Sequence, residues 1–175
     1  APSIFEFAGA KEVALEFHSF SKTFNMAGWR IGWVCGSKQL LYPLEKFKSF
    51  LDYGVPTFIQ LGAVAALNGS QKCVREQAAI YERIMIKMVD GLNKIGWKTR
   101  QTKGTMYVWA ALPENLKKEG SLSVAERLLQ ETGVVVSPGV GFGSCGEGYI
   151  RIALVTHDKR FHDALLRFKQ FTKGK

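Results

Sequence analysis

A single lysine, Lys22, lies in a stretch whose other residues could bind an anion. The stretch His18–Trp33 reads HSFSKTFNMAGWRIGW. Ser19 and Ser21 supply hydroxyl donors, and Arg30 supplies a planar fork that suits a phosphate group. A lysine beside serines is usually a solvated loop residue, so Lys22 is of interest because these three donors accompany it.

A lysine beside a phosphate site has two common uses. It can act as a point charge on a nucleotide phosphate, but that site requires the pattern GxxxxGK[ST], which the sequence lacks. It can also form a Schiff base with a carbonyl cofactor whose phosphate is held by its neighbours. The second use accounts for the lysine, the serines and the arginine together.

A glycine-rich segment offers an apparent nucleotide motif further along the chain. Gly141–Gly146 reads GFGSCG and matches GxGxxG. In a dinucleotide-binding site the last glycine opens a helix, whereas here EGYIRIAL follows, which has the composition of a strand. The segment is therefore predicted to be a loop in which glycine allows positive φ or a close approach of the backbone to a ligand.

The stretch SFSKTFNMAGWRIGW resembles the lysine segment of class I/II, fold-type I, pyridoxal-phosphate-dependent aminotransferases, in which Ser-x-Ser-Lys and an aromatic residue precede Gly-x-Arg-x-Gly. The segment KGTMYVWAALP is similar to the small-domain hairpin of that family, and VVVSPGVGFG and YIRIAL are similar to its terminal substrate-binding segment. The resemblance covers essentially all 175 residues. It is strongest to the bacterial alanine (glutamate–pyruvate) branch, and aspartate and LL-diaminopimelate aminotransferases are near relatives.

The resemblance implies a role for each residue of the motif. Lys22 would bind pyridoxal 5'-phosphate as a Schiff base and would then act as general base at the substrate Cα. Ser19, Ser21 and Arg30 would bind the cofactor phosphate, and Arg151, on the strand YIRIAL, would clamp the substrate α-carboxylate. A neutral amine near pH 7 requires burial and nearby positive charge, so Lys22 is expected to be buried.

Hydrophobic periodicity predicts a mixed α/β chain in three parts. Residues 1–70 are expected to be an α/β end-piece, residues 71–96 a connecting helix, and residues 97–175 a small α+β domain. The resemblance implies that residues 1–70 are the C-terminal part of the large cofactor-binding domain and that residues 97–175 are the small C-terminal domain. Strands are predicted around 13–17 and 30–36, in the hairpin formed by WKTRQ and TMYVWAAL, at VVVS and at YIRIAL. Further helices are predicted to run from Leu40 towards Gly54, from Pro56 to Asn68, from Ser123 to Thr132, and onward from Thr156.

The resemblance further implies that these residues are the C-terminal portion of a longer enzyme. The opening residues, APSIFEFAGA, look like the interior of a larger protein. The absent part would carry most of the large-domain sheet, an acidic partner for the pyridine nitrogen, a ring stacked on the cofactor and the contacts of a homodimer. The 175 residues alone are therefore expected to be inactive, and the full-length protein to act on an amino acid and a 2-oxo acid.

Composition excludes or disfavours several other classes of protein. The net charge is +9, but the basic residues are spread along the chain and no nucleic-acid motif accompanies them, so nucleic-acid binding is not expected. No apolar run reaches the roughly 20 residues of a membrane span. The three cysteines form no CxxC pair, which favours a reducing, cytoplasmic setting and no metal site.

Two other functions remain open at the level of the residues. The chain could be a non-catalytic, aminotransferase-like effector module, although the intact lysine and both arginines argue mildly against this. It could also belong to another fold-type I enzyme that catalyses decarboxylation or elimination, because the lysine motif is compatible with these reactions. Arg151 favours substrates with a free α-carboxylate without choosing between the reactions.

Overall fold

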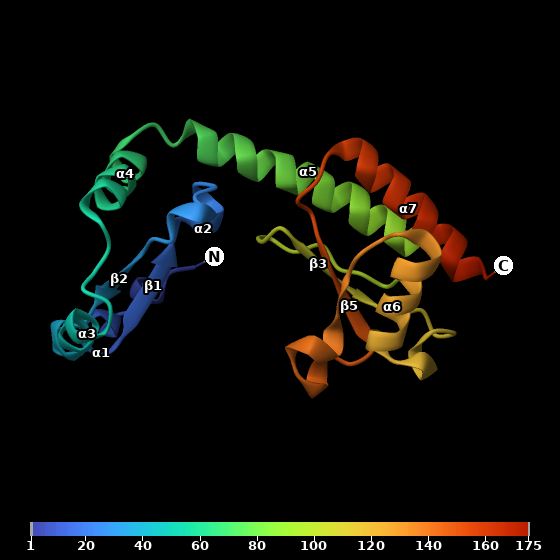
Figure 1. Cartoon of the computed structure of the whole chain (residues 1–175), viewed down its shortest axis with the longest axis horizontal. Helices are drawn as coiled ribbons and strands as arrows, with labels where there is room; N and C mark the ends of the chain where they lie inside the picture. The colour runs from blue at the N-terminus through green and yellow to red at the C-terminus, as the bar shows by residue number, and fades with distance from the viewer. Residues whose placement is uncertain (1, 175) are drawn as a thin grey trace. The chain divides into compact units, whose positions relative to one another are not determined.

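The computed structural model describes residues 2–174, which form two compact units that meet in the chain between Gln77 and Ala78 (Figure 1). Each unit is described by itself. None of the helices in residues 2–174 is long and apolar enough to cross a membrane.

The first unit contains one antiparallel pair of strands with helices before and after it. Its elements in chain order are the 3₁₀ turn Ile4–Glu6, α1 (Ala10–Val13), β1 (Leu15–Ser19), α2 (Phe20–Thr23), the 3₁₀ turn Ala27–Trp29, β2 (Gly32–Gly36), α3 (Lys38–Leu51) and α4 (Thr57–Asn68). The strands pair from Leu15 opposite Gly36 to Ser19 opposite Gly32. The prediction of a strand from Val13 was wrong at its start, because Val13 ends α1 and the extended backbone begins only at Ala14.

The interior of the first unit is small. Among its described residues, the buried apolar side chains are those of Ala10, Phe20 and Ala63. Large side chains of α3, α4 and the loop between them are mostly exposed, for example Phe50 at 84% and Tyr53 at 95%. Val13, Phe17 and Trp33 of the strand region are also exposed. The first unit therefore presents an extensive apolar surface to whatever surrounds it.

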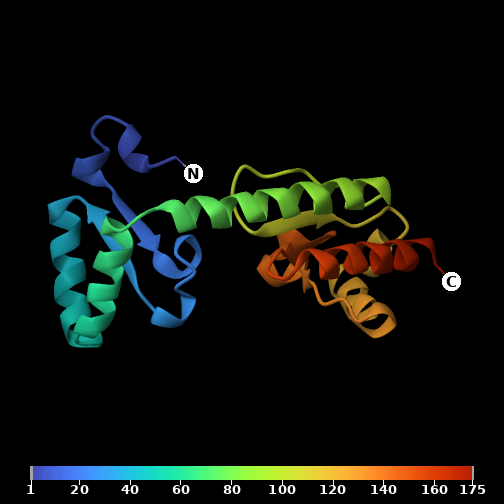
Figure 2. The same ribbon diagram turned by 90° about the horizontal axis from the view of Figure 1, so that it is seen from above.

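The second unit packs three helices and a three-stranded sheet around one core. The helices are α5 (Lys72–Lys94), α6 (Ser121–Thr132) and α7 (Asp158–Lys173), with a 3₁₀ turn at Lys117–Glu119 before α6. The sheet is antiparallel in the order β3 (Tyr107–Ala111), β5 (Tyr149–Ala153), β4 (Ser137–Pro138). Figure 2 shows α5 and α7 side by side, and Gly91 permits this closeness, because an added Cβ would lie 2.6 Å from Leu165.

The core of the second unit joins α5 to the small domain. Five side chains of α5 are buried in it: Ile84, Met85, Met88, Val89 and Leu92. The apolar side chains of α7 also lie in this core: Phe161, Phe168 and Phe171 are buried, and Leu165 packs against them. Trp97 is also fully buried, and its indole N–H donates to Thr172 at 2.7 Å. The helix predicted as a separate connector is therefore, from Ala78 onward, part of the second unit.

Four boundaries in the second unit differ from the prediction. The hairpin before Pro113 is reduced to β3 and a single bridge between Thr99 and Ala110, because Asn93 of α5 binds both backbone groups of Thr99 through its side-chain amide. Of the predicted strand VVVS, only Ser137 lies in a strand, the two-residue β4. Helix α6 begins two positions before Ser123, and α7 begins after His157 rather than at a Thr156 cap.

The glycine-rich segment is a loop, as predicted. It forms the 3₁₀ turns Gly139–Phe142 and Ser144–Gly146, and the chain then enters β5 rather than a helix. Gly143 lies between the two turns with φ of 108°, a backbone conformation that favours glycine. The two turns touch where Gly139 and Gly146 meet, because a Cβ on Gly146 would lie only 2.1 Å from the carbonyl oxygen of Gly139.

The close contact between the backbones of Gly139 and Gly146 predicts that two glycine substitutions in this loop differ strongly in their effect on stability. Gly146→Ala forces two backbone segments apart and should lower the free energy of unfolding by about 1–3 kcal/mol. Gly141→Ala is the matched control, since no atom lies within 4 Å of a Cβ placed there. Chemical denaturation of both variants measures the difference, and equal free energies of unfolding would contradict the close contact between Gly139 and Gly146.

Candidate functional site

Lys22 lies on a short helical turn that begins where β1 ends. The hydroxyl of Ser19 caps this turn by accepting the backbone N–H of Ser21 at 3.2 Å. The only fully buried side chain of the turn is Phe20, which anchors it to the unit. Lys22 is exposed, and no residue from 2 to 174 forms a hydrogen bond or an ion pair with its amine.

Antiparallel pairing brings Arg30 to the same end of the two strands as the lysine turn. Ser19, the last residue of β1, pairs with Gly32, the first residue of β2. The backbone N–H of Phe20 donates to the carbonyl of Ile31 at 3.2 Å. Arg30, directly before Ile31, is therefore close to the start of the turn that carries Lys22. The two strands, of five residues each, thus bring Arg30 near Ser19, which lies eleven positions before it in the chain.

The backbone of Arg30 is in an unusual conformation. It follows the 3₁₀ turn Ala27–Trp29 with φ of 52° and ψ of 49°, which is the left-handed region that non-glycine residues rarely adopt. One guanidinium nitrogen donates to the carbonyl of Ala27 at 2.9 Å. The ring of Trp29 packs onto α4 at Gly62, where a Cβ would lie 2.5 Å from the ring. Backbone strain of this kind is concentrated at functional sites, where the surrounding structure maintains it.

Two substitutions separate the backbone of Arg30 from its side chain. In the full-length protein, both Arg30→Gly and Arg30→Ala should weaken pyridoxal phosphate binding by about tenfold or more, because a hydrogen bond to a charged group contributes about 1.5–3 kcal/mol. The free energy of unfolding should be about 1 kcal/mol higher for Arg30→Gly than for Arg30→Ala, because glycine adopts the left-handed region without strain. Cofactor titration and denaturant unfolding measure the two effects. Unchanged cofactor affinity in both variants would remove the phosphate role.

Lys22 is exposed in the part of the chain that the structure describes. The expected burial concerns the cofactor site of the longer enzyme and stays a prediction. Ser19 and Arg30 are exposed as well, and Ser21 is half-buried. The cover that a neutral amine requires is therefore not supplied by the described residues.

The donor set nevertheless fits the proposed cofactor. Two hydroxyl groups and a guanidinium with free N–H groups suit a phosphate, and an unpaired amine suits an aldehyde carbon. These groups lie on two adjoining segments, 19–22 and 30, at one end of the strand pair. The residues present would hold the phosphate from one side and leave the amine free for covalent bonding.

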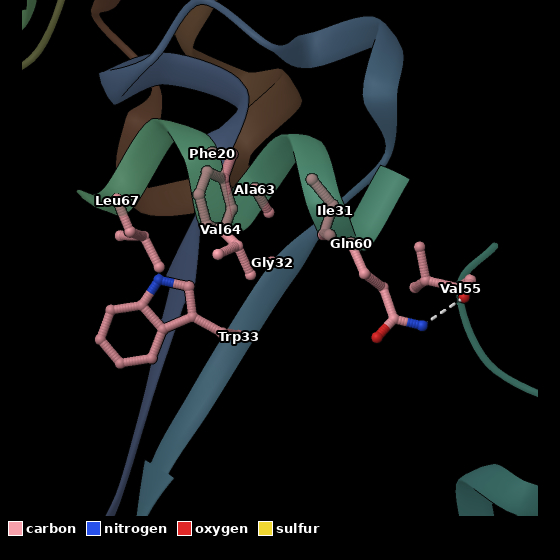
Figure 3. A pocket seen from close by; sticks show the side chains of 9 residues that line it. All are labelled: Phe20, Ile31, Gly32, Trp33, Val55, Gln60, Ala63, Val64 and Leu67. Carbon is pink, nitrogen blue, oxygen red and sulfur yellow. Dashed lines mark hydrogen bonds between the residues drawn. The ribbon is translucent and has the colours of Figure 1, made fainter. Parts of the chain in front are cut away.

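A cavity of about 310 Å³ lies behind the lysine turn, between β2 and α4 (Figure 3). Its lining is almost wholly apolar: Phe20, Ile31, Gly32, Trp33, Val55, Gln60, Ala63, Val64 and Leu67. Its one side-chain amide, from Gln60, donates to the carbonyl of Val55 at 2.6 Å, as the dashed line in Figure 3 shows. Since no ionisable side chain lines it, this cavity has no group suited to acid–base chemistry and is distinct from the polar face that carries Lys22.

A network of polar groups holds the strand that leads into the lysine turn. The carboxylate of Glu16 accepts hydrogen bonds from the hydroxyl of Ser3 and the backbone N–H of Ile4, each at 2.7 Å, and lies 2.6 Å from His18 Nε2. The Ser3 hydroxyl, together with these neighbours, holds the pKa of Glu16 below its usual range. His18 stacks on Trp33 with ring centroids 3.9 Å apart. The residue before Ser19 is thus fixed on both sides.

Arg151 lies in the second unit, at the centre of β5. It is half-buried and pairs directly with Trp109 on one side and Ser137 on the other. Its guanidinium lies over the rings of Tyr107 and Phe142. Neither ring was predicted from the sequence. Strand alternation in Tyr107–Ala111 could have indicated Tyr107, but no local pattern indicates Phe142, which reaches Arg151 from the glycine-rich loop.

Comparison with known proteins identifies the family of the chain. Residues 2–167 match the model of the family described as aminotransferase class I and II. The chain is 46% identical over 169 residues to the glutamate–pyruvate aminotransferase AlaC of Escherichia coli strain K12, an alignment that covers 97% of this chain and 41% of that protein. It is 44% identical over 172 residues to an LL-diaminopimelate aminotransferase of Dehalococcoides mccartyi, covering 98% of this chain and 44% of that protein.

Solved structures agree with the sequence relatives. A probable N-succinyldiaminopimelate aminotransferase from Thermus thermophilus superposes with a TM-score of 0.91 at 34% identity, covering 98% of this chain and 45% of that one. An aromatic aminotransferase from Pyrococcus horikoshii gives a TM-score of 0.89 at 32% identity, covering 98% and 46%. The chain thus spans less than half the length of these relatives and has the fold-type I architecture that they share. By sequence over nearly its whole length and by fold, this chain belongs to the class I and II aminotransferase family.

Proposed function

We propose that the full-length protein containing this chain is a pyridoxal-phosphate-dependent aminotransferase. It transfers an amino group between an L-amino acid, such as alanine or aspartate, and a 2-oxo acid such as 2-oxoglutarate. The family assignment supports the reaction type, and the relatives named as glutamate–pyruvate and LL-diaminopimelate aminotransferases support amino acids and 2-oxo acids as the substrate classes. As in the resemblance, we propose that it acts as a homodimer in the cytoplasm.

The observation that carries this proposal is the arrangement of Ser19, Lys22 and Arg30. Because β1 pairs with β2, the Ser19 hydroxyl and the Arg30 guanidinium, which can both donate hydrogen bonds to an anion, lie at the same end of the strand pair as the amine. A phosphate held by Ser19, Ser21 and Arg30 would orient the rest of the cofactor towards the lysine. A free amine beside a phosphate cradle suits a cofactor that is held by its phosphate and attached through a Schiff base.

In the proposed reaction each residue of the chain has one task. The bound cofactor supplies an electron sink for the bond that breaks at the substrate Cα. Lys22 would hold the cofactor covalently in the resting enzyme and would act as the base that takes the proton from the substrate Cα. Arg151 would hold the substrate α-carboxylate and so restrict the orientation of the bound substrate.

Borohydride reduction of the full-length protein tests the central assignment. Reduction should fix the cofactor permanently onto one lysine, and mass spectrometry of the digested protein should find it on the peptide that contains Lys22. Labelling of another lysine would contradict the assignment. Absence of any labelled lysine, in a protein that binds the cofactor, would favour a non-catalytic effector module.

The 175 residues alone should behave differently from the full-length protein. Because the first unit exposes the large apolar side chains of α3 and α4, including Phe50 and Phe58, the isolated chain should self-associate at micromolar concentration. A polypeptide of residues 70–175 is the control, since its core is closed, and it should stay monomeric in sedimentation velocity. The 175-residue chain should show no transaminase activity and no cofactor absorbance change when an amino acid is added. Turnover by these residues alone would overturn this expectation.

A further inference from the structure

One face of the sheet in the second unit carries a single arginine among aromatic side chains. Side chains alternate along a strand, and in β3 Val108 and Ala110 are buried in the core. Tyr107 and Trp109 therefore point to the opposite face. Arg151 of β5 pairs directly with Trp109, so its side chain lies on that same face.

Aromatic ring faces, rather than an acidic side chain, hold Arg151. Its guanidinium carbon lies over the ring of Tyr107, 4.4 Å from the centroid, and over the ring of Phe142, 4.3 Å from the centroid. A ring face attracts a cation through its quadrupole but brings no negative charge, so the rings orient the guanidinium without neutralising it. Within residues 2–174 no ion pair or hydrogen bond engages this guanidinium, and its N–H donors are free for a ligand.

The loop that carries Phe142 is itself fixed. The ring of Phe142 meets Trp109 edge to face, with centroids 5.5 Å apart. The backbone N–H of Val140 donates to the hydroxyl of the fully buried Ser121 at 3.1 Å, and that hydroxyl donates to Glu147 at 3.0 Å. Backbone N–H groups that donate to Glu147, first that of Gly148, hold the pKa of this carboxyl below its usual range. Together with the close contact between Gly139 and Gly146, these bonds give the loop a defined position over β5.

We propose that Phe142 and Tyr107 are positioning residues that hold the Arg151 guanidinium ready for the carboxylate of the substrate. This inference rests on the proposed aminotransferase function and deepens it. An arginine side chain loses much rotational freedom when it grips a ligand, and a side chain ordered beforehand binds more tightly for that reason. Loss of one ring should therefore weaken carboxylate binding and leave the proton transfer at Lys22 unchanged.

Binding of succinate to the full-length protein tests the inference without turnover. Succinate has carboxylates but no amino or keto group, so calorimetry measures its Kd on the cofactor-loaded protein in the absence of reaction. Phe142→Leu should weaken succinate binding by about fivefold, which is the size of one partly desolvated cation–π contact. It should raise the KM of the amino donor by a similar factor and change kcat and bound cofactor by less than about twofold. Phe142→Tyr keeps a ring face and should bind like the unmodified protein.

Two further variants make the outcome decisive. Tyr42→Leu is the matched control, because it removes an exposed ring beside another cation, Lys46, at 5.8 Å, and it should change nothing. In an Arg151→Gln background, Phe142→Leu should have no further effect on the KM of the amino donor, since the cation is already gone. Additive effects of the two substitutions, or failure of Phe142→Tyr to restore binding, would overturn the positioning role.

The same variants separate this inference from the proposed function. If Arg151→Gln weakens succinate binding but Phe142→Leu does not, the positioning role alone is wrong. If neither substitution weakens binding, Arg151 is not the carboxylate ligand, and the substrate-binding part of the proposed function fails with it.

Discussion

Lys22→Ala should lower the kcat of the full-length enzyme by about a thousandfold or more. A positioned general base alone contributes about 10²–10⁴-fold, and the substitution also removes the group that bonds covalently to the cofactor. Reduction with borohydride should no longer link cofactor to the protein. Cofactor affinity should fall much less than kcat, because Ser19, Ser21 and Arg30 still bind the phosphate.

Lys22→Arg separates the chemistry of the amine from its charge. A guanidinium stays protonated in proteins, so this variant keeps the positive charge but provides neither a nucleophile nor a base. It should be as inactive as Lys22→Ala. Lys38→Ala, an exposed lysine at the start of α3, is the control and should retain full activity. Substantial turnover by Lys22→Arg would show that the lysine acts only as a charge.

Arg151→Ala should raise the dissociation constant for the amino-acid substrate by about thirtyfold or more. Truncating one partner of a charged, bidentate contact in a buried site costs on the order of 2–5 kcal/mol, and about 1.4 kcal/mol corresponds to tenfold. Cofactor affinity should change little, because the phosphate is assigned to Ser19, Ser21 and Arg30. Equilibrium titrations with amino acid and with pyridoxal phosphate measure the two affinities separately.

Arg151→Lys is the informative companion. Lysine keeps the charge but lacks the planar fork that matches a carboxylate, so its affinity for the amino acid should lie between those of Arg151→Ala and the unmodified enzyme. If Arg151→Ala leaves amino-acid affinity unchanged and instead loses the cofactor, then the roles of Arg151 and Arg30 have been exchanged.

Local sequence signals predicted the elements whose determinants lie within the element itself. Helix α4 begins at Thr57 and ends at Asn68, as Pro56 and Gly69 indicate, because proline is favoured at the start of a helix and glycine commonly follows its end. The strand β5 and the buried stripe of α7 followed from the spacing of their apolar residues. The lysine motif was also local, which is why it could be recognised before any geometry was known.

Elements whose extent depends on distant partners were predicted less well. The hairpin predicted before Pro113 is too long, because the side-chain amide of Asn93 in α5 binds the backbone N–H and carbonyl of Thr99, which a second strand would have used. Periodicity also treated α5 as a connector, because a helical stripe shows that one face is apolar without showing what covers it. Only the tertiary structure shows that this face is buried in the core of the second unit.

The amino-acid sequence by itself determined the chemical groups to which we assign roles: the amine of Lys22, the hydroxyl groups of Ser19 and Ser21, and the guanidinium groups of Arg30 and Arg151. The tertiary structure decided the environment of each group. Antiparallel pairing brought Arg30 close to the turn that carries Lys22. The left-handed backbone conformation of Arg30 was not predicted by any residue pattern. A loop nine positions before Arg151 in the chain placed the ring of Phe142 over its guanidinium. Residue type fixes which bonds a group can form, whereas exposure, strain and neighbouring charge depend on segments that meet only when the chain is folded.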